Sequence, residues 1–184
     1  MAENFHIVVE GEEDRRFLKS YLSTLGVTIP DGHLRALNGW TNLDGYKPNI
    51  EQKQDQGVKV IIIFDANNSQ EKRMKQIRDV LGNITPPVFL FPDDKSAGGL
   101  EDLLLQIVIP EYLEVLECFD DYKKCLNKHN HNYTLPDIKG KVYAYKEAIG
   151  ALQKRADQFD SKYWNYGHPA LNPLKKFLTE HIGK

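Results

Sequence analysis

The sequence is poor in cysteine, since Cys118 and Cys125 are the two among its 184 residues. Two cysteines exclude a small disulfide-held scaffold, and buried apolar thiols are the default expectation for both. No apolar run reaches the roughly 20 residues that a bilayer-spanning helix needs, so we expect no transmembrane helix and no membrane partner. The first residues contain neither a basic nor a long apolar segment, so no signal peptide is readable and we expect a reducing cytoplasm.

An excess of charge of either sign is also missing. The chain carries 24 Lys and Arg against 26 Asp and Glu, a formal net charge of −2. Such a chain is not a bulk polyanion binder, and it would need a local basic patch or a bridging cation to hold nucleic acid. Hydrophobic residues make up 41% of the sequence, which is ordinary for a globular protein and excludes disorder as the main state.

Strand-like and helix-like segments alternate over residues 1–109. The expected strands are residues 5–9, 33–37, 58–64 and 87–91. The third is the clearest, because its apolar residues from Val60 to Phe64 show no polar alternation, which is typical of a parallel strand buried on both faces. We therefore predict an α/β fold with an about four-stranded, mainly parallel sheet flanked by helices.

The rest of the chain, residues 110–184, is predicted to be helical. Apolar stripes at helical spacing include Val142 and Tyr145 in one segment and Leu171, Leu174 and Leu178 in another. About 75 residues is small for an independent domain, so we expect a helical extension packed on the core. The predicted organisation is an α/β core over residues 1–109 and a C-terminal extension over residues 110–184.

Acidic residues follow three of the expected strands. Glu10 comes after the first strand with Asp14 four residues later, Asp65 and Asn67 end the third, and Glu101 begins the helix after the last. Ligands of an open parallel sheet bind beyond the carboxyl ends of the strands, so these side chains are expected at one edge. Gathered carboxylates repel one another, and a bound divalent cation relieves the repulsion. Oxygen ligands of this kind suit Mg²⁺, Mn²⁺ or Ca²⁺.

A structural reading competes with this one, because acidic residues near a helix N-terminus gain about 0.3–1 kcal/mol from the helix dipole. That reading suits the acidic residues of loops and helix starts, namely Glu12, Glu13, Asp93, Asp94 and Asp102. Asp65 differs, because it directly follows a wholly apolar strand, where a buried carboxylate needs a partner. The same argument favours a functional role for Glu10.

Two segments carry a resemblance to a known family. Residues 7–18 read Ile-Val-Val-Glu10-Gly-Glu-Glu-Asp14-Arg-Arg-Phe-Leu, and residues 61–67 read Ile-Ile-Ile-Phe-Asp65-Ala-Asn67. They resemble the Toprim domain, the metal-dependent catalytic unit of topoisomerases, bacterial primases, recombination-type nucleases and OLD nucleases. Residues 91–104 and the segment Lys139-Gly-Lys-Val-Tyr narrow the resemblance to a small bacterial family with an OLD-type Toprim-like fold.

The resemblance implies roles for individual residues. Glu10 would be the acid/base or metal-bound carboxylate, Asp65 a metal ligand, Glu101 a further ligand and Asp14 a supporting one. Asn67 stands where a second Asp is usual in the family. An amide offers a carbonyl oxygen without a charge, so a two-metal site would be weaker here.

The leading hypothesis is a Mg²⁺- or Mn²⁺-dependent phosphodiester enzyme, nuclease-like, acting on nucleic acid. Lys95 is a weak candidate for contacting the phosphate, against a solvated loop lysine as the alternative. Trp40 and Tyr46 are candidates for stacking on bases, against packing in the core or at its rim.

Two other functions are compatible with the sequence. The first is a catalytically degenerate Toprim-like module that binds a protein or nucleic-acid partner, for which Asn67 and the net charge of −2 argue. The second is a small-molecule phosphotransferase, since such sheets host many chemistries. The absence of a glycine-rich nucleotide loop ranks that one last.

Overall fold

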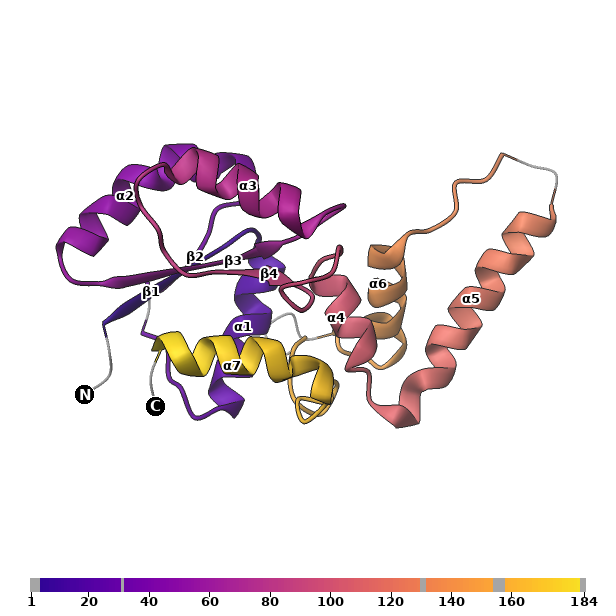
Figure 1. Cartoon of the computed structure of the whole chain (residues 1–184). Helices are drawn as coiled ribbons and strands as arrows, with labels where there is room; N and C mark the ends of the chain where they lie inside the picture. The colour runs from indigo at the N-terminus through magenta and orange to yellow at the C-terminus, as the bar shows by residue number, and fades with distance from the viewer. Residues whose placement is uncertain (1–3, 31, 130–131, 154–157, 183–184) are drawn as a thin grey trace.

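The protein is built around one parallel sheet (Figure 1). The computed structural model describes all residues except 1–3, 31, 130–131, 154–157 and 183–184. The strands are β1 (Phe5–Val9), β2 (Leu34–Ala36), β3 (Lys59–Asp65) and β4 (Val88–Phe91). Their order is β2-β1-β3-β4, and every neighbouring pair is parallel. The predicted α/β class is confirmed.

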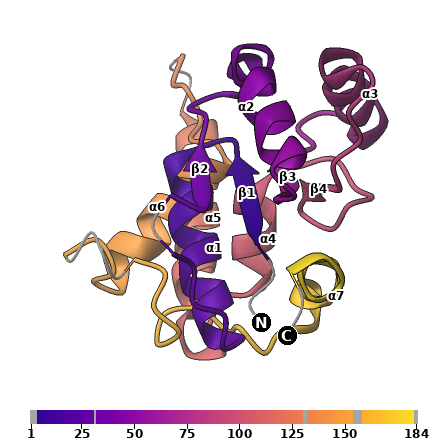
Figure 2. The ribbon, with the colours of Figure 1, turned by 90° about the vertical axis from the view of Figure 1, so that its left-hand side faces the viewer.

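Helices cover both faces of the sheet (Figures 1 and 2). One face carries α2 (Leu43–Asp55), preceded by the short helix η1 (Trp40–Asn42), and α3 (Gln70–Leu81); the other carries α1 (Glu12–Thr24), α4 (Leu100–Gln106) and α7 (Asn172–Ile182). In β3, Val60, Ile62 and Phe64 pack in the core under α2 and α3, whereas Ile61 and Ile63 join the core on the opposite face. All five are buried, as the unbroken apolar run predicts.

The remaining helices lie beyond the carboxyl ends of the strands. The short helix η2 (Pro110–Tyr112) leads into α5 (Leu113–Lys128), which packs against α6 (Ile138–Ala148), and η4 (Pro169–Leu171) leads into α7 (Figure 1). The buried residues Tyr145 and Trp164 share one hydrophobic core with Ile61 and Phe91 of the sheet. The division of the chain at residue 109 stays a prediction.

Helix α5 has no buried residue, and its cysteines correct one expectation. Cys118 and Cys125 are both exposed rather than buried. The reason is that α5 packs chiefly against α6 and lies away from the sheet, so most of its surface faces solvent. Among the described residues, no helix combines the length and the apolar character required to cross a bilayer.

Candidate functional site

Four carboxylates gather at the carboxyl edge of the sheet. Glu10 directly follows β1 and Asp65 ends β3, while Asp14 and Glu101 lie in the first turns of α1 and α4. Burial raises the pKa of Asp65 and of Asp14, and the charges of Glu10 and Glu101 raise both further. The structure thus brings these four predicted residues within electrostatic reach of one another. We call Glu10, Asp14, Asp65 and Glu101 the carboxylate cluster.

Asp65 is fixed by the turn that begins α4. Burial, followed by the charges of Glu10 and Glu101, raises its pKa to about 7. The Leu100 N–H donates a hydrogen bond of 2.9 Å to Asp65 Oδ1, which favours the charged form. A Cβ at Gly99 would lie 2.8 Å from Asp65 Cγ, so the close approach of α4 to this carboxyl requires glycine.

Asp14 joins the carboxylate cluster while also capping its own helix. The Gly11 N–H donates a hydrogen bond of 2.7 Å to Asp14 Oδ2, a reciprocal contact found at helix N-termini. Burial raises the pKa of Asp14 well above its usual range, and the charge of Asp65 adds to the effect. Asp14 is therefore a supporting member of the cluster, with one oxygen already engaged.

Glu10 contains an unsatisfied polar atom. Its Oε2 is buried and has no hydrogen-bond partner among the described residues. A buried acceptor without a donor costs about 1–3 kcal/mol, and such atoms are rare in folded proteins. A cation or a hydrogen-bond donor at this position would satisfy it.

Lys139 of α6 brings a positive charge to the cluster. Its Nζ lies 3.6 Å from Glu101 Oε1, and the charge of Glu101 is the main cause of its raised pKa, with smaller effects from Asp65 and Asp14. In the sequence, residues 139–143 contribute to the family resemblance, but nothing in them assigns Lys139 to the site. No local pattern marks a lysine as site-facing, because its position depends on how α6 packs against α4.

Asn67 and Lys95 are both exposed and lie in the loops after β3 and before α4. Asn67 is exposed with a left-handed φ of 52°, and its backbone N–H and C=O pair with those of Gly98 at 2.7 Å each. This pair ties the loop after β3 to the loop before α4. Lys95 is exposed and lines a hollow shared with Asn172 and Lys176 of α7. Its charge acts on Asp93 and Asp94 in its own loop.

The two aromatic candidates make packing contacts on the α2 side of the sheet. The Arg73 guanidinium lies 4.6 Å from the Trp40 ring centroid, which is a cation–π contact. The Tyr46 hydroxyl and His6 Nε2 are 3.0 Å apart, within hydrogen-bond distance. These contacts match the packing alternative for both rings.

The donor set of the cluster fits a hard cation, although no finished coordination shell is present. Within the described part of the chain, no three His, Cys, Asp or Glu side chains are arranged closely enough to hold a metal ion as they stand. The available donors are nevertheless all carboxylate oxygens, and Glu10 Oε2 is buried without a partner. Carboxylates of this kind suit Mg²⁺ or Mn²⁺, which retain several waters in their coordination shell.

Fold and site together define an α/β protein with an acidic cluster at the carboxyl edge of a parallel sheet. The chain belongs to the family described as Protein of unknown function (DUF3226), whose model matches residues 4–182. No curated protein matches the chain.

Similarity to solved structures was found for the C-terminal region of the Xanthomonas campestris pv. campestris OLD protein. One structure has 13% sequence identity and a TM-score of 0.40, and it covers 98% of this chain and 78% of that one. A second has 14% identity and a TM-score of 0.42, with coverages of 98% and 80%. At these values the likeness carries no argument about activity, and membership of the Toprim family stays a prediction.

Proposed function

We propose that the protein is a Mg²⁺- or Mn²⁺-dependent phosphodiester enzyme, nuclease-like, that acts on nucleic acid. The observation that supports it most is the convergence of four carboxylates from separate elements, with Glu10 Oε2 buried and unpaired. Gathering like charges costs stability unless protons or cations offset the repulsion. A divalent cation would offset it and would also attract a phosphodiester to a near-neutral protein.

In this proposal Glu10 and Asp65 hold the cation, with Glu101 and Asp14 in support. When bound, the metal supplies positive charge that stabilises the charge developing on the scissile phosphate. The chain contributes the geometry: Gly99 lets α4 approach Asp65, and the Leu100 N–H fixes one oxygen of that carboxylate. Lys139 offsets the charge of Glu101 at the mouth of the cluster.

A non-catalytic binding module is the second candidate. Asn67 favours it, because a neutral amide stands where the resemblance expects a second carboxylate, and its backbone is tied to Gly98. Lys139 favours it as well, since its Nζ already pairs with Glu101 Oε1 at 3.6 Å. A module of this kind would bind its partner without cleaving it.

Incubation with single- and double-stranded DNA and with RNA in the presence of Mn²⁺ tests the proposal. We expect cleavage by the wild type and a loss of about 100-fold or more in Glu10→Gln and Asp65→Asn, because each removes a ligand charge. Glu12→Gln is the matched control, since Glu12 is an exposed carboxylate that pairs with Arg15 at 2.8 Å. Cleavage by both cluster variants at the wild-type rate would reject the proposed enzymatic function. Absence of any cleavage would favour the non-catalytic binding module.

A further inference from the structure

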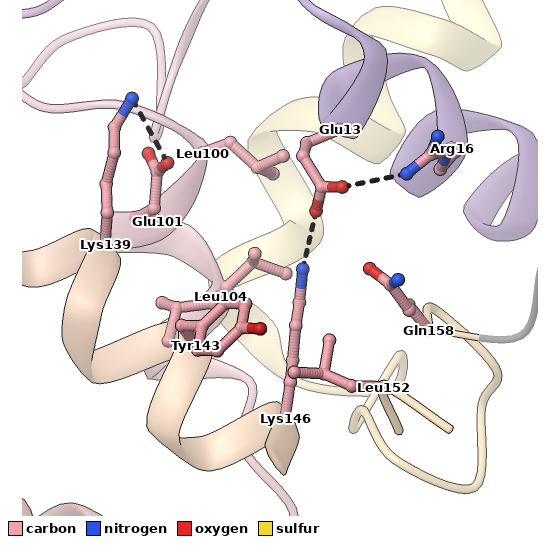
Figure 3. Close-up of a pocket in the computed structure, with 11 residues that line it drawn as sticks. Glu13, Arg16, Leu100, Glu101, Leu104, Lys139, Tyr143, Lys146, Leu152 and Gln158 are labelled. Carbon is pink, nitrogen blue, oxygen red and sulfur yellow. Dashed lines mark hydrogen bonds and ion pairs between the residues drawn. The ribbon is translucent and has the colours of Figure 1, made fainter. Parts of the chain in front are cut away.

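A pocket of about 550 Å³ opens between α1, α4 and α6, next to the carboxylate cluster (Figure 3). Glu101 lines the pocket and is also a member of the cluster. Leu100 lines the pocket as well, and its N–H donates to Asp65. The volume lies within the range of about 300–1,000 Å³ that is usual for small-ligand sites. The proposed enzyme therefore has an adjoining space large enough for part of a substrate.

The two ends of this pocket differ in net charge. At one end Glu13 is 3.1 Å from Arg16 Nη1 and 2.6 Å from Lys146 Nζ, so one carboxylate faces two cations. At the other end Lys139 faces Glu101 at 3.6 Å, beside the cluster. Figure 3 shows the two sets of ion pairs on either side of Leu100 and Leu104. The Glu13 end thus has an excess of positive charge and is suited to an anion.

The wall between the two ends is apolar. Leu100, Leu104 and Val142 are almost fully buried, and they present their accessible atoms to the pocket. Beside them Tyr143 is 62% exposed, the highest value among the large hydrophobic side chains that the structure describes. An exposed aromatic ring next to an apolar wall is a typical surface for stacking a base.

We propose that this pocket binds one unpaired nucleotide of a single-stranded chain, the nucleotide that adjoins the bond to be cleaved; the inference rests on the proposed function. A nucleotide within a chain has a phosphate on each side of its sugar, and its base is planar, with apolar faces and polar edges. The pocket offers a matching series: the cluster end for the scissile phosphate, the apolar wall and Tyr143 for the base, and the Arg16 end for the next phosphate. We expect an unpaired base here, because enzymes that hold a base in a pocket act on single strands or take the base out of the duplex.

Arg16 and Tyr143 are the residues through which the inference is best tested. Lys146 is nearly buried, held by Glu13 and placed 4.3 Å from the centroid of the Phe159 ring, so its loss would disturb packing. Arg16 is more accessible, and its exposed ion pair contributes little to folding. Arg15 provides a matched control, because it makes an equivalent pair with Glu12 on the same helix but does not line this pocket.

The experiment is calorimetric titration with thymidine 3′,5′-bisphosphate in Mg²⁺, a probe that contains no internucleotide bond. We expect Arg16→Gln and Tyr143→Ala each to weaken binding by about five-fold or more, with Tyr143→Phe close to wild type. Arg15→Gln and Tyr122→Ala, the latter an exposed tyrosine of α5, should change it by less than about two-fold. A labelled single-stranded oligonucleotide should compete with the probe, and a blunt duplex should not.

Three outcomes would overturn the inference. They are equal effects of Arg16→Gln and Arg15→Gln, inorganic phosphate binding as tightly as the bisphosphate, and a duplex competing as well as a single strand. Because the probe is bound and not cleaved, the result is independent of catalysis. Nucleotide binding without any nuclease activity would reject the proposed function alone, whereas nuclease activity with wild-type binding by Tyr143→Ala would reject the pocket alone.

Discussion

Among single residues, Asp65 combines the most informative observations. It ends a fully apolar strand, its pKa is raised to about 7 first by burial and then by Glu10 and Glu101, and a backbone N–H fixes one of its oxygens. Only part of this is readable from the sequence. An acidic residue after an apolar strand indicates a special carboxylate, but which other carboxylates face it depends on the fold.

The raised pKa of Asp65 predicts a stability effect that depends on pH. The folded state binds a proton between pH 3.8 and about 7 that the unfolded chain releases, so the unfolding free energy falls as pH rises through that window. Asp65→Asn removes the cost of ionising this carboxyl group in the folded state, and it keeps an acceptor for the Leu100 N–H. In EDTA at pH 8 we expect the variant to be more stable than wild type by about 1–2 kcal/mol, and by much less at pH 5.

Urea unfolding at the two pH values measures this difference. Asp79→Asn serves as the control, because Asp79 is a largely exposed carboxylate of α3 that pairs with Lys75 at 2.6 Å. If the Asp65→Asn variant is no more stable than wild type at pH 8, the ionised carboxylate of Asp65 does not lower the stability of the folded state.

Among the elements, the turn between β4 and α4 does most to shape the site. Gly98 has a φ of +132° and Gly99 lies against Asp65, while Asp102 accepts a 2.7 Å hydrogen bond from the Gly99 N–H. The sequence contains two glycines directly before this helix. It does not show that one of them touches a carboxylate 34 positions earlier.

Gly99→Ala tests the importance of that contact. The added Cβ would lie 2.8 Å from Asp65 Cγ, so α4 or the carboxyl must move. We expect a loss of about 1–3 kcal/mol in the unfolding free energy, together with weaker Mn²⁺ binding. Gly45→Ala in α2 is the matched control, because a Cβ there meets nothing within 4 Å and should be neutral or slightly stabilising.

The sequence predicts the core elements better than the peripheral ones. Strand β3 follows from a local apolar signal, the unbroken run from Val60 to Phe64. The exposure of α5 and the position of Lys139 do not, because both depend on how α5 and α6 pack beyond the sheet.

In the whole molecule, the parallel sheet gathers groups of both charges at one edge of a chain with a net charge of −2. All four strands end at one edge, which gathers the acidic residues there, and α6 brings Lys139 and Lys146 to the same side. The composition predicts that a bridging cation or a local basic patch would be needed to hold nucleic acid. It does not say where either would lie. The fold places candidates for both next to one another.

The most direct test of the account is calorimetric titration of the full chain with Mn²⁺ at about pH 6.5, in two buffers of different ionisation enthalpy. The account predicts saturable binding with release of protons, because Asp65 is partly protonated at this pH in the absence of a cation. Both the binding and the proton release should be lost in Asp65→Asn and kept in Asp79→Asn. No binding up to about 10 mM Mn²⁺, or equal binding by wild type and Asp65→Asn, would contradict it.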